Sequence, residues 1–498
     1  MNANFYAAVE AANRDRSDKA CLETDQGRVY CFAEVFREAG RFARFLTDLG
    51  LVRGDRVAVQ VDKSPVGFFL YLGCLRAGLV YLPLNTAYQR AEIGYFLEDA
   101  EPAVIVCRPS TQEMISELAA GRAKVFTLDG QGAGTLAEAS SNAGTDYATI
   151  ESAPDDLAVI IYTSGTTGRS KGAMVTHRNL LANARALIET WQFSERDVLL
   201  HALPVFHVHG LFVANHCALL SGARMLWQPK FEPAAVLRAL PRTSVMMGVP
   251  TFYTRLLTEP SFDQAACSAI RLFISGSAPL QPETFREFAE RCGHIILERY
   301  GMSEAGMITS NPLNGERRSG SVGFPLAGVA VRVADETDRA LPPGATGGIQ
   351  VKGDNVFAGY WHKPEKTREE FSADGWFRTG DMGVVDKDGY LAIVGRAKDL
   401  VISGGYNVYP REIELALDAM PGVIESAVIG LPDPDFGEAV TAIVVMSSTA
   451  TFDPQTMIRE LKNNIANYKI PKHIHRVEEL PRNAMGKVQK AALRERFR

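Results

Sequence analysis

The sequence predicts an α/β protein that carries a smaller α+β domain at its carboxyl end. Short apolar runs alternate with stretches of helical periodicity up to about Gly344, a pattern typical of layered, largely parallel sheets. Glycine-punctuated, strand-like segments then indicate a small antiparallel, barrel-like subdomain. The chain has 498 residues, and single hydrophobic cores stop growing at about 250–300 residues. At least two domains are therefore expected.

Strands and helices alternate in the first part of the chain. The expected strands are Val57–Val61, Leu79–Leu82, Ala103–Cys107, Leu157–Tyr162, Ser244–Val249 and Leu272–Ser275. The expected helices between them are Pro65–Arg76, Leu180–Trp191 and Pro282–Arg291. The segment Asp129–Asp155 is rich in Gly, Ala, Ser and Thr, so it is expected to be a loop.

The last 150 or so residues change pattern twice. The strand-like segments of the antiparallel subdomain are Gly348–Lys352, Gly383–Val385 and Tyr390–Val394. After Arg396, two helices (Glu412–Met420 and Asp453–Ile465) and two strands (Glu425–Leu431 and Ala439–Val445) are expected. They suffice for an α+β domain of about 100 residues. We place the boundary at Arg396–Asp399, which gives domains 1–397 and 398–498.

Composition excludes several classes of protein. Lys+Arg number 53 and Asp+Glu 58, so the formal net charge of −5 offers no electrostatic reason to bind nucleic acid or an anionic membrane. The amino terminus lacks the apolar core of a signal peptide, and no run reaches the roughly 18 apolar residues of a membrane span. The seven cysteines are widely spaced without a CxxC pair. They predict reduced thiols rather than a zinc site, in a cytoplasmic protein.

A segment rich in glycine and hydroxyls directly follows the expected strand Leu157–Tyr162. It reads Tyr162-Thr-Ser-Gly-Thr-Thr-Gly-Arg-Ser-Lys-Gly172. Glycines let a backbone approach a polyanion, while hydroxyls, N–H groups and an ammonium neutralise it. A phosphate-binding loop is therefore predicted. The P-loop NTPase signature GxxxxGK[ST] does not fit, because Ser170 precedes Lys171 and Gly172 follows it.

This segment resembles the phosphate loop of the adenylate-forming enzymes, which include acyl-CoA synthetases, luciferases and peptide-synthetase adenylation domains. Four further motifs resemble that family in the same order: Tyr300-Gly-Met-Ser-Glu304, Trp376-Phe-Arg-Thr-Gly-Asp381, Gly395-Arg-Ala-Lys-Asp399 and Pro481-Arg-Asn-Ala-Met-Gly-Lys487. The resemblance implies an enzyme that uses ATP, Mg²⁺ and coenzyme A. It also implies a large ATP- and acid-binding domain and a mobile C-terminal lid.

The resemblance assigns roles to individual residues. It implies that ATP contacts Thr163, Ser164, Gly165, Thr166, Thr167, Gly168, Arg169, Ser170, Lys171, Ser277, Glu298, Tyr300, Gly301, Ser303, Asp381, Arg396 and Lys487. The catalytic residues that it implies are Lys171, Glu304 and Lys487, and Glu304 is also the metal ligand. It further implies that Lys398 is the hinge and that Ser403, Gly404 and Gly405 line the pantetheine tunnel.

The chemistry of these residues agrees with their implied roles. Tyr300 is expected in a turn, where its ring could cover a base, and Glu304 is a carboxylate of the kind that binds Mg²⁺ beside phosphates. Asp381 is expected in a tight turn, where it could accept both ribose hydroxyls. Arg396 lies fifteen residues later across an expected hairpin and could reach the same sugar. Lys487 would stabilise charge that accumulates on the α-phosphate.

Arg299 is the most informative residue for the choice of acid. It ends an apolar strand, and an unpaired cation buried there is costly. A second carboxylate on the substrate would pair with its guanidinium bidentately, and Arg169, His207 and Ser277 could complete the pocket. Two alternatives stay open. Arg299 could pair with Glu298, although neighbours on a strand point to opposite faces, and Arg169 could contact only phosphate or solvent.

The subfamily that these motifs resemble most is that of the malonyl-CoA synthetases. The resemblance lies in Gly168–Lys171, Phe206–Leu211, Gly248–Leu257 and Glu298–Glu304. It implies that malonate, with methylmalonate as a second acid, becomes an acyl adenylate and then an acyl-CoA. Because the charge of Lys487 is needed for adenylation, we also expect its acetylation to block that step, which would make a lysine acetyltransferase and a deacetylase partners of the chain. A short- or medium-chain monocarboxylate synthetase, a non-catalytic nucleotide-binding protein and a peptide-synthetase adenylation domain remain as alternatives. We expect the last to fit less well, because only eleven residues follow Lys487.

Overall fold

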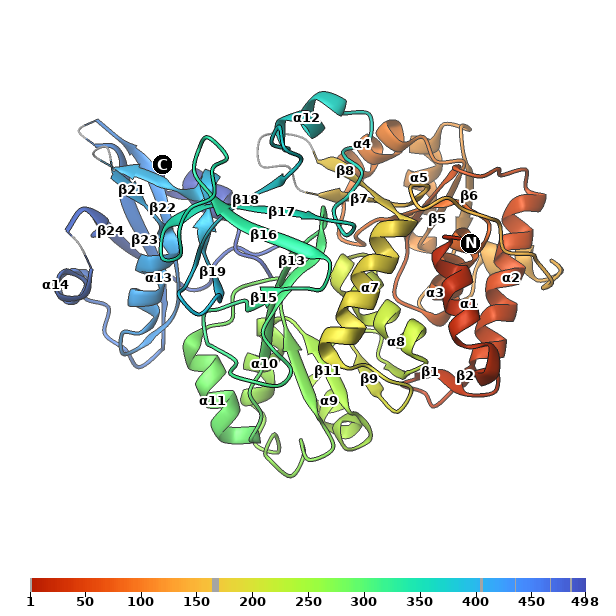
Figure 1. The fold of residues 1–498 in the computed structure, drawn as a ribbon, viewed down its shortest axis with the longest axis horizontal. Helices are drawn as coiled ribbons and strands as arrows, with labels where there is room; N and C mark the ends of the chain where they lie inside the picture. Colours follow the sequence, from red (N-terminus) through yellow and green to blue (C-terminus); the bar gives the residue numbers. More distant parts are fainter. Residues whose placement is uncertain (1, 164–169, 404–405, 435, 466, 484–485) are drawn as a thin grey trace.

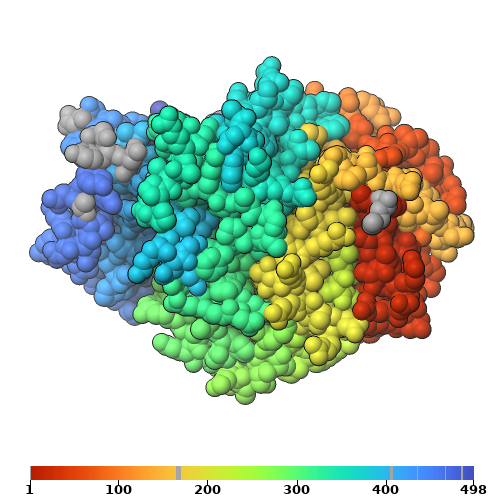
Figure 2. Space-filling view, in the orientation of Figure 1, coloured from red at the N-terminus to blue at the C-terminus, as the bar shows by residue number. Residues whose placement is uncertain are grey.

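The computed structural model describes residues 2–163, 170–403, 406–434, 436–465, 467–483 and 486–498. Figure 1 shows a large layered part that contains the amino terminus and a smaller part at the opposite end that contains the carboxyl terminus. In the space-filling view, the blue C-terminal residues lie against the teal and green residues of the larger part (Figure 2). The predicted combination of a large α/β domain and a small C-terminal domain is confirmed.

The first sheet of the large domain has six strands. In spatial order they are β6 (Lys124–Thr127), β5 (Val104–Cys107), β3 (Arg56–Gln60), β4 (Val80–Pro83), β7 (Leu157–Thr163) and β8 (Lys171–Thr176). All neighbours are parallel except β7 and β8, which are antiparallel. The near-continuous apolar runs of β4 and β5 are fully buried, as expected for parallel strands covered on both faces.

The second sheet of the large domain has nine strands. In spatial order they are β15 (Phe324–Pro325), β14 (Gly306–Ser310), β13 (Leu297–Met302), β12 (Leu272–Ser275), β11 (Val245–Gly248), β9 (Val198–His201), β10 (Arg224–Trp227), β1 (Ala20–Thr24) and β2 (Val29–Cys31). The run from β13 to β1 is parallel, and the strands at both edges are antiparallel. The predicted largely parallel sheets are thus confirmed.

Helices pack on the two sheets. They are α1 (Phe5–Ala12), α2 (Phe32–Asp48), α3 (Pro65–Arg76), α4 (Arg90–Ala100), α5 (Gln112–Ala119), α6 (Thr135–Ser140), α7 (His177–Trp191), α8 (Asn215–Ser221), α9 (Pro233–Ala239), α10 (Pro250–Leu257), α11 (Pro282–Cys292) and α12 (Pro364–Glu369). Helix α3 begins at Pro65 after an N-cap bond from the Gly67 amide to Ser64. Because α3 is apolar all round, it is buried along nearly its whole length.

The predicted antiparallel subdomain is a four-stranded sheet. Its strands are β16 (Val329–Ala334), β17 (Thr346–Gly353), β18 (Phe377–Val385) and β19 (Leu391–Arg396), in that spatial order. The C-terminal domain has β20 (Val401–Ser403), β21 (Tyr406–Val408), β22 (Val423–Asp433), β23 (Gly437–Met446), β24 (His473–Val477), α13 (Pro410–Asp418), α14 (Pro454–Asn464) and α15 (Lys490–Phe497). The short 3₁₀ helix Ala397–Asp399 joins the two sheets.

The expectation that residues 129–155 form only a loop is wrong. The segment Asp129–Asp155 contains the short helix α6, whose Leu136 is buried in the core. Tertiary packing of that one apolar side chain outweighs the loop-like composition. Within the described residues, no helix is both long and apolar enough to cross a membrane.

Candidate active site

Two strands from different sheets place Tyr300 against Asp381. The Tyr300 hydroxyl donates to Asp381 Oδ2 at 2.5 Å, and Arg396 Nε lies 2.9 Å from Asp381 Oδ1. Asp381 and Arg396 face each other in the β18–β19 register, so the predicted hairpin is confirmed. The predicted turns are wrong: Tyr300 lies within β13 and Asp381 within β18. Gly380, at φ +73°, bends β18 just before Asp381.

Glu304 lies just after β13 and is held by two hydroxyl groups. Thr163, at the end of β7, donates to Glu304 Oε1 at 3.2 Å, and the Tyr360 hydroxyl donates to the same atom at 3.3 Å. The residue is 7% exposed, and burial raises the pKa of its carboxyl. Carboxylate and hydroxyl oxygens are the hard ligands that Mg²⁺ prefers, so this donor set fits a magnesium ion.

The lysine of the glycine- and hydroxyl-rich segment is held by an acidic and an aromatic side chain. Lys171 Nζ lies 2.9 Å from Glu370 Oε1 and 4.1 Å from the centre of the Tyr360 ring. The Tyr95 hydroxyl donates to the carbonyl of Ser170 at 2.7 Å. Six of the residues predicted to bind ATP lie outside the described residues: Ser164, Gly165, Thr166, Thr167, Gly168 and Arg169.

Lys487 lies between the two domains. Its amide donates to Asn483 Oδ1 at 3.0 Å, and a Cβ added at neighbouring Gly486 would lie 3.7 Å from Thr251 Oγ1 of α10. Desolvation, with the nearby charge of Arg396, lowers the pKa of Lys487 to about 8, although the residue as a whole is exposed to solvent. The lysine is thus near the Asp381–Arg396 pair.

Arg299 is buried without an anionic partner among the described residues. It is 3% exposed, and its Nε and one terminal nitrogen have no hydrogen-bond partner there. Its guanidinium lies flat on Gly276, where an added Cβ would be 2.4 Å from Cζ. Burial lowers the pKa of Arg299 to about 9. Neighbouring Glu298 instead accepts from the Leu280 amide at 3.1 Å, so the alternative pairing of Arg299 with Glu298 is not formed.

Two histidines face Arg299 from a tight segment between β9 and α8. His207 precedes a π-helix, His209–Ala214, and His209 begins it. His209 is 1% exposed, and its Nδ1 lies 3.2 Å from Ser277 Oγ, while its Nε2 has no described partner. Burial and the Arg299 charge lower the pKa of His209 and bring that of His207 to about 4. Both rings are therefore neutral near pH 7.

Ser277 borders this pocket, and Ser275 lies two residues before it at the end of β12. Ser277 has φ +74°, a left-handed conformation that is uncommon for a non-glycine residue. Ser275, at the end of β12, is fully buried with an unpartnered hydroxyl among the described residues. The pocket thus contains a guanidinium and two neutral imidazoles, whose N–H groups suit a carboxylate. The Ser277 hydroxyl is bonded to His209 Nδ1.

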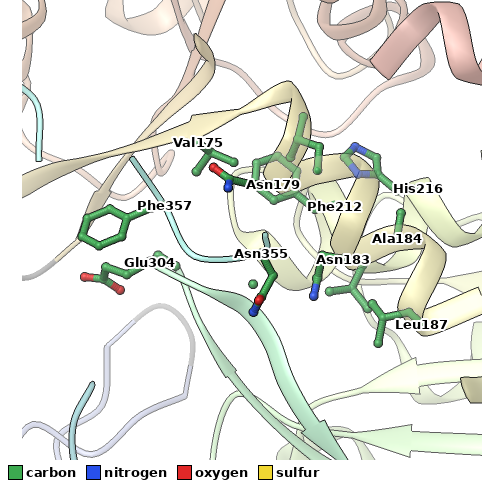
Figure 3. Close-up of a pocket in the computed structure, with 14 residues that line it drawn as sticks. Val175, Asn179, Asn183, Ala184, Leu187, Phe212, His216, Glu304, Asn355 and Phe357 are labelled. Carbon is green, nitrogen blue, oxygen red and sulfur yellow. The ribbon is translucent and has the colours of Figure 1, made fainter. Parts of the chain in front are cut away.

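A second, enclosed cavity lies behind Glu304. Figure 3 shows Glu304, Asn355, Asn183 and Phe212 around it, between α7, the π-helix and the β13–β14 connection. Its volume is about 20 Å³, and a buried water needs at least about 10–15 Å³ on this measure. It can hold a water on the unpartnered Asn355 Oδ1, but it is too small for an acid.

Comparison with known proteins identifies the chain. The model of the AMP-binding enzymes matches residues 9–361, and that of their C-terminal domain matches residues 412–487. The chain belongs to the AMP-binding enzymes. As a member of this family, it is an AMP-forming acid–thiol ligase that uses ATP and coenzyme A. Magnesium is the metal typical of the family.

Several AMP-binding enzymes resemble the chain over nearly its full length. Feruloyl-CoA synthase of an Amycolatopsis species is 37% identical over 476 residues, 95% of this chain and 94% of that protein. Malonate–CoA ligase of Arabidopsis thaliana is 34% identical over 539 aligned residues, 98% of this chain and 88% of that protein. ATP-bound MatB of Rhodopseudomonas palustris is 52% identical, with a TM-score of 0.98 over 100% of this chain and 99% of that one.

The arrangement of the domains resembles that of an ATP-bound AMP-binding enzyme. The apo structure of the same MatB gives a TM-score of only 0.87 at the same identity and coverage. In the present structure, Arg411 of α13 donates to Gln281 Oε1 of the large domain at 3.2 Å. In this arrangement Lys487 lies near the Asp381–Arg396 pair.

The remaining predicted residues are dispersed. Gly301 packs against the Gly306 carbonyl, and Ser303 lines the small cavity behind Glu304. Lys398 lies in the 3₁₀ helix between the domains, and Ser403 ends β20. Gly404 and Gly405 lie outside the described residues.

Sequence reasoning missed residues that contact the predicted ones. Tyr360 and Glu370 hold Glu304 and Lys171, and His209 shares the acid pocket with Arg299. The signal for His209 was present in Phe206-His-Val-His209, where only the first histidine was selected. Tyr360 and Glu370 gave no comparable signal, because they lie 56 and 199 residues from their partners.

Proposed function

We propose that this AMP-binding enzyme is a malonate–CoA ligase that also accepts methylmalonate. Malonate and ATP form malonyl-AMP and pyrophosphate, and the thiol of coenzyme A then displaces AMP to give malonyl-CoA. Malonate–CoA ligases are among the relatives of this chain. Feruloyl-CoA synthase is equally similar, so the acid must be argued from the pocket.

Arg299 carries the proposal. It is a buried guanidinium with two unpartnered nitrogens and no described acid nearby, and such a group is costly unless a substrate anion pairs with it. The hydrocarbon tail of a fatty acid supplies no such anion. The distal carboxylate of malonate does, and it accepts two parallel N–H bonds from Arg299. His209 Nε2–H is the further donor, because the Ser277 hydroxyl donates to Nδ1 of the same neutral ring.

The first half-reaction uses the residues near the Asp381–Arg396 pair. In our proposal, Asp381 and Arg396 bind the ribose and the Tyr300 ring covers the adenine. Lys171 binds the outer phosphates. Lys487 lies beside the reacting carboxylate and the α-phosphate, where it stabilises the charge that develops during attack.

The magnesium ion and the second half-reaction complete the scheme. Glu304, with the Thr163 hydroxyl beside it, would hold Mg²⁺, which neutralises phosphate charge. Rotation of residues 398–498 about Lys398 then removes Lys487 from the site. It brings Ser403, Gly404 and Gly405 to the pantetheine of coenzyme A.

An acid panel tests the proposed substrate. We expect turnover of malonate and methylmalonate to exceed that of acetate and octanoate, and Arg299→Ala to abolish this preference. A methyl group is worth only about 1–3 kcal/mol of discrimination, so both dicarboxylates should react. Faster turnover of acetate or octanoate by the wild type would instead identify a monocarboxylate synthetase.

A further inference from the structure

Lys63 is a buried lysine outside the ATP and acid sites, and none of the described carboxylates forms an ion pair with it. It follows β3 in the six-stranded sheet and is 8% exposed. Its Nζ lies 2.9 Å from Nδ1 and 2.7 Å from the carbonyl oxygen of His201, and 4.4 Å from the centre of the Trp227 ring. A lysine in such a place is rare unless its donors are used.

His201 connects Lys63 to a second segment of the chain through its other ring nitrogen. It ends β9 in the nine-stranded sheet and is fully buried, and its Nε2 lies 3.0 Å from the Gly210 carbonyl. A carbonyl only accepts, so Nε2 carries the hydrogen and Nδ1 of the neutral ring accepts from Lys63. Burial and the Lys63 charge lower the pKa of His201, which keeps the ring neutral.

The Gly210 carbonyl belongs to the segment that carries the two acid-pocket histidines. Gly210 is the second residue of the π-helix and packs so closely on Pro204 that an added Cβ would lie 2.0 Å from the Pro204 carbonyl oxygen. The amide of Leu211 donates to the carbonyl of His207 at 2.8 Å. Bonding from His201 to Gly210 therefore fixes the turn that presents His207 and His209 to Arg299.

We propose that Lys63 and His201 are positioning residues that orient the His207–His209 segment for acid binding. The pair joins the two sheets of the large domain and makes no described contact with the ATP-binding residues. Its loss should therefore weaken acid binding while leaving ATP binding intact. The inference depends on the place of the acid pocket and not on which acid is natural.

Lys63→Met tests the proposal, because methionine keeps the length and apolar stem but removes the donors. We expect KM for the acid to rise about tenfold, since two buried acceptors lose their partner, while KM for ATP stays within about twofold. The acid used is whichever the wild type converts fastest. A failure of the malonate proposal is therefore seen in the wild-type panel and does not affect this result.

Tyr71→Phe is the matched control. It removes a buried bond of 2.8 Å to the ring of His216, a residue of α8 that follows the π-helix and forms no described hydrogen bond with the His207–His209 segment. We expect it to lower thermal stability without changing KM for the acid. An equal rise in acid KM for Tyr71→Phe, or equal rises in both KM values for Lys63→Met, would reduce the pair to a role in folding.

Two His201 variants keep the test decisive if Lys63→Met does not fold. Glutamine places an N–H donor close to the position of Nε2, whereas asparagine is too short to reach the Gly210 carbonyl. We expect His201→Gln to retain the wild-type KM for the acid within about threefold, and His201→Asn to show the rise expected of Lys63→Met. Equal acid KM values for the two variants would overturn the proposal.

Discussion

The ammonium of Lys171 lies 2.9 Å from the carboxylate of Glu370 and over the ring of Tyr360. The side chain of Lys171 is 14% exposed and that of Glu370 is 30% exposed, so this ion pair is partly shielded from water. If Lys171 binds the outer phosphates as proposed, the phosphates of ATP compete with Glu370 for the lysine. The Tyr360 hydroxyl also donates to Glu304. The same tyrosine therefore contacts both Lys171 and the expected metal ligand.

Glu370→Gln should strengthen ATP binding. The amide still accepts a hydrogen bond from Lys171, but it no longer repels the phosphates or competes with them by charge. A partly exposed ion pair is worth up to about 1 kcal/mol, so we expect KM for ATP to fall about two- to fivefold. Glu369→Gln is the control, because Glu369 pairs with Lys366 on the surface. An unchanged or higher KM for ATP in Glu370→Gln would contradict this prediction.

Asp381→Asn should weaken nucleotide binding through the ribose. The carboxylate accepts from both Tyr300 and Arg396, and charge-assisted bonds of this kind are about twice as strong as neutral ones. We expect KM for ATP to rise about 10- to 100-fold and the preference for ATP over 2′-deoxy-ATP to disappear. Asp386→Asn, just beyond the same strand, is the matched control. Retention of that preference in Asp381→Asn would place the ribose elsewhere.

The sequence was sufficient for the fold class and for the position of several strands. The apolar runs located β3, β5 and β12 to within one residue, because strands buried on both faces are defined by composition alone. The hairpin from Asp381 to Arg396 was also predictable from spacing. The turns expected at Tyr300 and Asp381 were wrong, because both residues lie inside paired strands: Tyr300 pairs with Thr309 of β14, and Asp381 pairs with Arg396 of β19.

The contacts that support the site could not be predicted from one sequence. Lys63 and His201 lie 138 residues apart. Lys63 follows a strand of the six-stranded sheet and His201 ends a strand of the nine-stranded sheet, so nothing local predicts their contact. Similarly, the Gly276 backbone supports the Arg299 guanidinium only because β12 and β13 are neighbours. Such contacts depend on tertiary packing rather than on local propensity.

His209→Gln and His209→Asn should separate the two nitrogens of the imidazole. Glutamine can donate from near the Nε2 position toward the acid, whereas asparagine keeps only the contact with Ser277. We expect KM for malonate to rise less than about threefold in the glutamine variant and about tenfold or more in the asparagine variant. KM for acetate, which has no distal carboxylate, serves as the internal control. Equal effects on both acids would exclude a bond from His209 to the distal carboxylate.

Lys487 should set an alkaline limit on adenylation. Its pKa is lowered to about 8 by desolvation and by Arg396, and only the charged form stabilises the α-phosphate. We expect kcat/KM in pyrophosphate exchange to fall above about pH 8, since this ratio reports groups of the free enzyme. Lys487→Arg should shift this alkaline decrease in kcat/KM to higher pH. Lys487→Gln, which mimics acetyl-lysine, should lower the rate about 10²- to 10³-fold. A flat profile to pH 10 would contradict the assignment.

Glu298→Gln should stabilise the protein at alkaline but not at acidic pH. Burial raises the pKa of Glu298 from 4.5 to about 7, against smaller opposing effects of the Leu280 amide and Arg411. The folded protein thus retains a proton that the unfolded chain releases between about pH 4.5 and 7, and stability falls as pH rises through this window. Glutamine keeps the acceptor for Leu280 and removes the charge. We expect a gain in the free energy of unfolding of up to about 3 kcal/mol at pH 8 and almost none at pH 4.5, measured by urea unfolding.

Glu283→Gln, on the exposed face of α11, is the control and should show no such pH dependence. An equal gain at both pH values would mean that the carboxyl does not titrate in this window.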